Sequence, residues 1–351
     1  MRQRGFSLIE VLVAATIAVI VGAIAVQATV ATNKSITRLR RQSPVQQDAR
    51  LLSDFLFEQV QEAGGGLVRP WHAIVVDDGC VAQDGLPSCG GAGTSDRLRI
   101  FSTDTTRASC QVTARTSSTL TSTALDTDGD GTVDTCCPAL NGMGSSMVAL
   151  TDPDDASRIE YYHTAVASTS TSSCTLGIKN AGVPVVKMPL VSITRTIGVS
   201  TPAQITPGAV FVYQVVTSTA DPTTKDLVRY EDTDHNNVFA LSERSVMAPR
   251  VYDLQGALGY DGSPADGRLT EDGTTADEWR YMSAGDGALP PDAVDTQLRM
   301  ARFGVVLGTQ IQDAPPQSVK LLNRTTGVSE PGMWLAGVVA TAYLRNTFLF
   351  E

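Results

Sequence analysis

The sequence has little of the chemistry that enzymes and zinc sites use. Only three histidines occur among its 351 residues, and none accompanies a nucleophile pattern such as G-x-S-x-G. No C-x-x-C pair occurs, and the scarcity of histidine further disfavours a zinc site built from cysteine. The many serines and aspartates would allow a Ser-His-Asp set to be drawn, but nothing in the sequence selects one. We therefore expect no catalytic residues and no enzymatic activity.

Positive charge is also scarce. The chain has 27 lysines and arginines against 37 aspartates and glutamates, a formal net charge of −10. Nucleic acids and anionic lipids attract proteins through clustered positive charge, so neither is expected as the main partner of an acidic head. No stripe alternates basic and aromatic residues in the way that single-strand binding surfaces do. The local exception is a basic collar, defined by Lys34, Arg38, Arg40 and Arg41.

What the sequence does have is a long apolar run near its start. Val11 to Val26 carries no charge, and residues 6–31 would form a helix about 39 Å long, enough for a hydrocarbon core of about 30 Å. One acid, Glu10, lies at the head of this run, where an unpaired carboxylate costs a few kcal/mol. A secretory signal peptide has a shorter apolar region and no such acid. The run therefore predicts a retained membrane anchor.

The segment GFSLIEVLVA, from Gly5 to Ala14, resembles the class III signal of type IV prepilins and type II secretion pseudopilins. The resemblance implies cleavage between Gly5 and Phe6 by the prepilin peptidase on the cytoplasmic side, N-methylation of Phe6, and retention of the helix. It also implies that Glu10 neutralises the N-terminal amine of a neighbouring subunit during filament assembly. The alternative is a generic membrane anchor with a chance acid.

The helical pattern resumes beyond the membrane run. Apolar residues recur at spacings of three and four, which predicts one buried stripe. The stripe consists of Val45, Ala49, Leu52, Leu56, Val60 and Ala63. Three glycines at 64–66 predict the end of the helix, and Pro44 predicts a kink or a split. We interpret the basic collar as touching lipid headgroups. Its positive charges lie on the outer side of the membrane, against the positive-inside rule, so the orientation of the chain in the membrane is inferred from the prepilin motif.

Downstream of residue 66 the hydrophobic period changes to two and β-branched residues become common, which predicts strands. The predicted strands span residues 72–76, 97–102, 147–151, 158–163, 185–197, 210–216, 226–231, 246–254, 300–308 and 334–345. Thr/Ser-rich and Gly/Asp-rich stretches between them are interpreted as surface insertions. The expected fold is an α+β pilin-like lollipop, with a long hydrophobic helix packed on a mostly antiparallel head. The expected divisions are a leader at 1–5, a membrane or filament-core helix at 6–31, an amphipathic helix at 32–66, and a head at 67–351 with insertions at about 77–145 and 256–297.

Further segments resemble PilW-type minor pilins, and the end of the long helix also resembles J-type minor pseudopilins. These segments are residues 47–50, 55–56, 61–65, 227–230, 246–250, 251–255, 258–261 and 339–346. The resemblance does not extend to residues 80–180. Many major pilins carry a proline near the position of Gln27, and this chain has none there, so helix melting in a filament is not expected at that point.

The PilW resemblance implies a minor pilin of the type IV pilus, a structural subunit of the tip or priming complex that initiates assembly and supports adhesion or motility. Its implied partners are other minor pilins, the major pilin, a tip adhesin, the prepilin peptidase and the inner-membrane assembly platform. The implied location is the inner membrane with a periplasmic head, and then the cell-surface pilus. Two alternatives stay open: a J-type minor pseudopilin of a type II secretion system, and a calcium-dependent surface-binding module on a pilin anchor.

An even number of cysteines in an exported chain indicates disulfides. Cys80 and Cys89 would close a short Gly/Pro-containing loop, which makes them the most natural local pair. Cys136 and Cys137 are adjacent and are expected to bond to different partners. The sequence does not choose among the remaining pairings. The six candidates are Cys80, Cys89, Cys110, Cys136, Cys137 and Cys174.

Two aspartate-rich segments are candidate calcium loops. The first, DTDGDGTVD, follows the D-x-D-x-D-G pattern, in which alternate carboxylates converge if the chain curls at the glycine. Its expected ligands are Asp126, Asp128, Asp130, Thr132 and Asp134. The second segment has oxygen ligands at positions 1, 3, 5 and 12 of an EF-hand-like loop, and these are Asp232, Asp234, Asn236 and Glu243. The alternatives are a solvated Asp/Gly turn for the first and a hairpin rich in Asp and Asn for the second.

Overall fold

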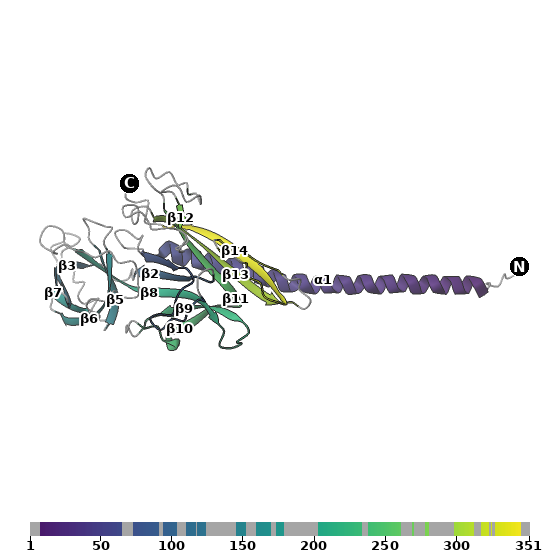
Figure 1. Ribbon diagram of the computed structural model, residues 1–351, viewed down its shortest axis with the longest axis horizontal. Coiled ribbons are helices and arrows are strands. Elements are labelled where there is room, and N and C mark those ends of the chain that lie inside the picture. The colour runs from purple at the N-terminus through teal and green to yellow at the C-terminus, as the bar shows by residue number, and fades with distance from the viewer. Residues whose placement is uncertain are drawn as a thin grey trace, which may run out of the picture.

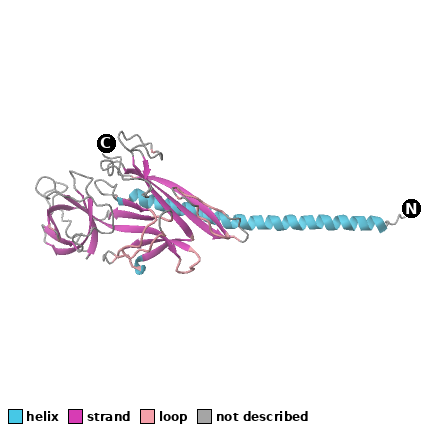
Figure 2. Ribbon diagram, viewed as in Figure 1, coloured by secondary structure: helices cyan, strands magenta, loops and turns pink. Residues whose placement is uncertain are grey.

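The protein consists of one long helix and a β-rich head, which confirms the predicted α+β lollipop (Figure 1). The computed structural model describes residues 8–64, 73–90, 94–103, 110–116, 118–123, 145–151, 159–169, 173–178, 203–233, 238–260, 269, 278–280, 298–311, 317–322, 324 and 327–344, and the statements below concern these residues. Figure 2 shows the long helix in the N-terminal part and strands making up most of the other described residues.

Helix α1 spans Leu8–Glu62, and its two halves have different surroundings. The first half projects from the head as a stalk, whereas the second half lies along strands of the head (Figure 1). All six residues of the predicted stripe are buried, so this prediction is confirmed. The predicted end is confirmed as well. The helix stops at Glu62, and Gly64 takes the left-handed φ of 66° that ends helices and that glycine adopts without strain.

Of the two outcomes predicted for Pro44, the split is wrong, because α1 continues through it, and the kink stays a prediction. A proline inside a helix removes one backbone hydrogen bond and costs about 3 kcal/mol. Pro44 directly precedes Val45, the first residue of the buried stripe, and Ala49 follows one turn later. Packing of this stripe on the head offsets the lost hydrogen bond and keeps the two halves in one helix.

The described strands pair in an antiparallel manner and form two sheets. They are β1 Ile74–Asp77, β2 Arg97–Thr103, β3 Cys110–Arg115, β4 Thr119–Thr123, β5 Ser145–Thr151, β6 Ile159–Thr169, β7 Ser173–Ile178, β8 Ala203–Thr217, β9 Lys225–Glu231, β10 Arg244–Pro249, β11 Val251–Tyr260, β12 Glu278–Arg280, β13 Leu298–Gln310 and β14 Met333–Tyr343, with a 3-10 turn at Leu241–Glu243 before β10. Strands β1 to β10 form the larger sheet, and the order in the smaller one is β12-β11-β13-β14.

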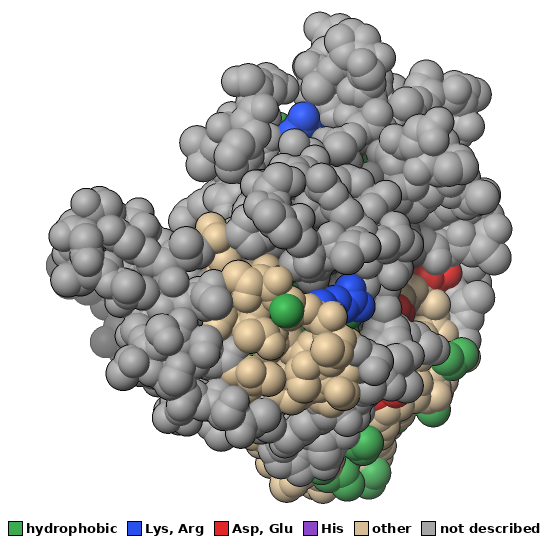
Figure 3. All heavy atoms as spheres, turned by 90° about the vertical axis from the view of Figure 1, so that its left-hand side faces the viewer, with side chains coloured by type: hydrophobic (Ala, Val, Ile, Leu, Met, Phe, Trp, Pro, Cys, Tyr) green, Lys and Arg blue, Asp and Glu red, His purple; other side chains and the backbone are tan. Residues whose placement is uncertain are grey.

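Part of the larger sheet closes on itself as a small barrel. The pairing path β8-β3-β4-β7-β6-β5 returns to β8, because the first half of β8 pairs with β3 along one edge and with β5 along the other. In Figure 1 these strands lie at the end of the head opposite the N-terminus. Figure 3 views that end, and the described part of its surface carries few charged side chains.

The main core lies where α1 meets the two sheets. It joins the apolar stripe of α1 to residues of β1, β2, β8 and β9 from the larger sheet and of β11, β13 and β14 from the smaller one. Strand β11 is buried along its whole length, since it lies between the larger sheet and its own neighbours. Tyr252, Val306 and Leu335 face the other side of the smaller sheet, where Leu321 and Val328 cover them.

Sequence periodicity located most of the described strands but missed several in the Thr/Ser-rich stretches. Residues 103–123, interpreted as an insertion, contain β3 and β4, because threonine suits strands yet gives no apolar alternation. The single strand predicted at 246–254 is wrong: β10 and β11 are separate and meet at Arg250, whose φ is 59°. The strand predicted at 185–197 lies outside the described residues.

Candidate functional site

The processing and assembly residues lie at the free end of α1. Gly5 and Phe6 are outside the described residues, and the helix is described from Leu8 onward. Glu10 lies in the first turn, where the helix dipole favours a negative side chain. The first turn of α1 lies at the end of the projecting half, far from the head (Figure 1). The pairing role expected for Glu10 stays a prediction.

The projecting half of α1 is apolar and uncovered. An 18-residue window has a mean hydropathy of 2.6 and no buried residue, so α1 is long and apolar enough to cross a membrane. Large apolar side chains are exposed on all faces, from Leu8 to Val30. Such a surface is unstable in water and is covered in a bilayer or by other apolar helices. Among the described residues of α1, the buried ones all lie in the other half, from Val45 onward.

The second half of α1 is fixed to the head through β8. The Tyr213 hydroxyl donates a hydrogen bond of 3.0 Å to the Gln59 side-chain oxygen, and the rings of Phe55 and Tyr213 meet edge to face at 6.3 Å. Leu56 is fully buried between these two helix residues. Burial raises the pKa of Tyr213 to about 12, so its hydroxyl keeps its proton at physiological pH. These contacts join the second half of α1 to the larger sheet, in addition to its packing on β13 and β14.

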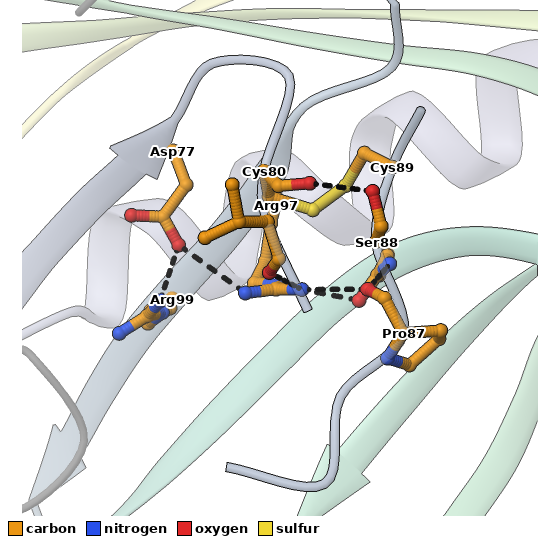
Figure 4. Close-up of polar contacts among 9 residues, drawn as sticks. Asp77, Cys80, Pro87, Ser88, Cys89, Arg97 and Arg99 are labelled. Carbon is orange, nitrogen blue, oxygen red and sulfur yellow. Dashed lines mark hydrogen bonds and ion pairs between the residues drawn. A yellow bond between two sulfur atoms is a disulfide. The ribbon is translucent and has the colours of Figure 1, made fainter. Parts of the chain in front are cut away.

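A disulfide joins Cys80 and Cys89, which confirms the predicted local pair. The Cys89 amide also donates to the Cys80 carbonyl at 2.8 Å. Buried Arg97 in β2 holds the loop to the sheet, since its Nη2 donates to the carbonyls of Val81 and Pro87 at 3.2 and 2.8 Å (Figure 4). Of the other cysteines, Cys110 and Cys174 lie in β3 and β7 with side chains that are not described, and Cys136 and Cys137 lie outside the described residues.

Two arginines of β2, Arg97 and Arg99, are fully buried beside one carboxylate. Asp77 forms an ion pair with Arg99 and lies 3.8 Å from Arg97 (Figure 4). Arg97 also donates from Nε to the Gln214 side-chain oxygen at 3.1 Å. Burial lowers the pKa of Arg97 to about 10, and the charge of Arg99 adds to this effect while Asp77 opposes it. Arg97 stays protonated near neutral pH and serves as a structural clamp.

Sequence reasoning missed this cluster, since the alternation of arginine with Leu98 and Ile100 in β2 resembles an exposed polar face. Alternation of this kind shows that the two faces of a strand differ in polarity. It does not show that the polar face is exposed to solvent. Here the disulfide loop covers the arginine face.

Asp96 connects the two sheets just before β2. Its backbone amide donates to the Leu254 carbonyl at 2.7 Å, and its carboxylate accepts from the Gly256 amide at 2.8 Å. Ser95 exchanges two further hydrogen bonds with Leu254, at 3.0 and 3.2 Å. These bonds tie the start of β2 to β11, the central strand of the smaller sheet.

The environment of Asp96 is apolar and negatively charged. Burial raises the pKa of its carboxyl to about 8; the Gly256 hydrogen bond opposes this, and the charges of Asp78 and Asp253 add to it. Burial also raises the pKa of Asp253, although Asp253 pairs with Arg324. Asp96 is therefore mainly protonated at neutral pH. Sequence alone gives no indication of this, because the partners come from distant segments.

The candidate calcium residues are only partly described. Asp126, Asp128, Asp130, Thr132 and Asp134 lie outside the described residues, as do Asp234 and Asn236. Glu243 accepts hydrogen bonds from the Thr233 amide and hydroxyl at 2.6 and 2.8 Å, and from the Ala240 amide at 2.9 Å. It thus caps the turn before β10. Within the described part of the chain, no three His, Cys, Asp or Glu side chains form a group that could hold a metal ion.

Comparison with known proteins identifies the N-terminal segment. Residues 1–26 match the family model described as the prokaryotic N-terminal methylation motif. No curated protein and no solved structure matches the chain significantly.

The motif, with the apolar helix behind it, indicates a type IV pilin-like or pseudopilin protein with a class III prepilin signal. Such a protein associates with a membrane and with pilus-related partners. The projecting apolar helix is consistent with a single-pass anchor in the inner membrane.

Proposed function

We propose that the protein is a PilW-like minor pilin, a structural subunit of the tip or priming complex of a type IV pilus, without catalytic activity of its own. The observation that carries this proposal is the uncovered apolar half of α1, with Glu10 in its first turn and a methylation motif before it. Nothing in the described part of the head covers that surface, which supports lipid as its first partner and neighbouring helices as its later ones.

The mechanism is assembly. The prepilin peptidase cleaves after Gly5, and Phe6 becomes the methylated N-terminus of an inner-membrane subunit with a periplasmic head. The apolar half leaves the bilayer for the filament, where Glu10 neutralises the Phe6 amine of the adjacent subunit. The head then docks other minor pilins, the major pilin and a tip adhesin. The barrel end, which lies farthest from the anchor, is the surface best placed for the adhesin.

Mass spectrometry of the N-terminus, on protein recovered from sheared pili, tests processing and filament membership together. A mature chain that starts at methylated Phe6 is the expected result. An unprocessed Met1 start in the membrane, or absence of the chain from pili, would contradict the proposal. Loss of protein secretion instead of pili in a deletion strain would favour a J-type pseudopilin.

The pairing role of Glu10 has its own test. Glu10→Ala should leave membrane insertion intact, because it only makes the helix more apolar, but should impair pilus assembly. Glu10→Asp keeps the charge and serves as the matched control, with assembly at least partly retained. Normal piliation in Glu10→Ala would refute the pairing role.

A further inference from the structure

Figure 1 shows the neck of the molecule, where α1 leaves the head. An open pocket of about 630 Å³ lies there, between α1 and the residue that follows β13. Three members of the basic collar, Lys34, Arg38 and Arg41, line the pocket. Val30 of α1 lines it as well, and Ile311, which directly follows β13, contributes from the head. The fourth member of the collar, Arg40, does not line it. The pocket thus combines three cations with an apolar edge.

The head contacts one arginine of this pocket directly and the other through Gln42 of α1. Arg41 donates from Nη1 to the Gln310 carbonyl, at the end of β13, at 3.4 Å. With its amide oxygen facing its donors, Gln42 accepts from Arg38 Nε at 3.3 Å and from Trp334 Nε1 at 3.0 Å. Each guanidinium has five N–H donors, so these bonds fix its position and leave donors for a ligand.

The depth of the pocket matches the surface of a membrane. Lys34, Arg38 and Arg41 lie about 5, 10 and 15 Å beyond Ala31 along the helix axis. The headgroup layer extends roughly 5 to 8 Å beyond the hydrocarbon core, and helical side chains tilt toward the helix N-terminus, which here is the bilayer side. The cationic ends of Lys34 and Arg38 therefore reach the headgroup layer, while Val30 lies at the edge of the hydrocarbon.

We propose that this neck pocket binds the phosphate headgroup of an anionic phospholipid. Lys34 and Arg38 make the charged contacts, since arginine matches phosphate geometry and both cations reach the required depth. Val30 and Ile311 pack against the start of an acyl chain. Because the protein carries a net charge of −10, the three clustered cations stand out as a local anion site. The inference rests on the membrane-anchored state in the proposed function, and it implies that the lipid holds the free subunit at a fixed depth.

The test uses the full chain in detergent micelles, titrated with phosphatidylglycerol or with phosphatidylcholine, and native mass spectrometry to count retained lipids. Phosphatidylglycerol should be retained more strongly. Arg38→Gln should weaken its binding about fivefold, the effect of one cation near a headgroup. Lys34→Gln should act in the same direction, whereas the matched control Arg40→Gln should bind as the wild type does. Soluble glycerol phosphate should compete poorly, and equally strong binding of it would reassign the pocket to free phosphate esters.

Flotation of the same protein with vesicles separates this inference from the proposed function. Failure to float would overturn the anchor, and the lipid site with it. Flotation with equal retention of both lipids, or equal weakening by Arg38→Gln and Arg40→Gln, would overturn the lipid site alone. Normal lipid retention by Arg38→Gln together with loss of pilus incorporation would also overturn it, and would assign the pocket to an acidic surface of a neighbouring subunit.

Discussion

Replacing Asp96 by asparagine should stabilise the protein at alkaline pH and change its stability little near pH 4. The side chain is 1% exposed, and its pKa is raised from 3.8 to about 8, mainly by burial. At about pH 5 this carboxyl is protonated in the folded protein and ionised in the unfolded chain. The folded state thus binds one more proton, so the free energy of unfolding falls as the pH rises from about 4 to about 8.

The size of the change in unfolding free energy follows from the raised pKa of Asp96. Each pH unit inside this window lowers the free energy of unfolding by about 1.4 kcal/mol, so the fall between pH 5 and pH 8 is about 3 to 4 kcal/mol at most. That corresponds to a drop in Tm of roughly 10 °C for a head of this size. Asparagine keeps an oxygen for the Gly256 amide but cannot ionise. The variant should therefore lose this part of the pH dependence and retain the part due to Asp253, whose pKa is also raised.

Thermal melts of the full chain in mild detergent, followed by circular dichroism at a series of pH values, measure the effect. Asp96→Asn should melt close to the wild type near pH 4 and clearly above it near pH 8.5. Asp54→Asn, on the exposed face of α1, is the control and should leave the pH dependence unchanged. A difference between Asp96→Asn and the wild type that is the same at both pH values would refute the reasoning.

Three further predictions concern stability and metal binding. Leu56→Ala should cost about 2 to 5 kcal/mol in urea unfolding because Leu56 is fully buried, whereas Leu51→Ala, at a site 60% exposed, should cost no more than about 0.5 kcal/mol. Equal losses would show that the stripe does not anchor α1. The double variant Cys80→Ser, Cys89→Ser should lose about 2 to 3 kcal/mol, as expected for a closed loop of this length. A variant as stable as the wild type would show that Arg97 and Gln214 suffice to hold the loop. Calorimetry should detect calcium binding that Asp128→Asn abolishes, and the absence of binding heat in the wild type would remove the calcium prediction.

The sequence predicted the elements that are determined by residues close together in the chain, namely the buried stripe of α1, the end of α1 and the Cys80–Cys89 disulfide. The stripe from Val45 to Ala63 was found because a surface helix keeps one apolar face, and its end was found because a glycine run terminates it. The Cys80–Cys89 pair followed from the short separation of the two residues.

The remaining features depend on contacts between distant segments, which no local pattern contains. Leu120 and Leu176 are buried in the barrel, in the short strands β4 and β7. Most other residues of these strands are not large and apolar, so the sequence shows no clear alternation of apolar and polar residues there. Arg97 and Asp96 are buried by the disulfide loop and by β11, which lie on other parts of the chain. The neck pocket likewise needs Ile311 beside the basic collar, more than 260 residues away.

Strand β8 links the barrel end to the helix that anchors the protein. Its 15 residues span about 50 Å. The first half pairs with β3 and β5 in the barrel, and the second half pairs with β2 and β9 in the core. At the crossing, Gly208 packs so tightly that a Cβ would lie 2.6 Å from the Phe101 ring, so glycine is required there. The second half also carries Tyr213, which contacts Phe55 and Gln59 of α1. Strand β8 therefore runs without interruption from the barrel into the core on which the second half of α1 packs.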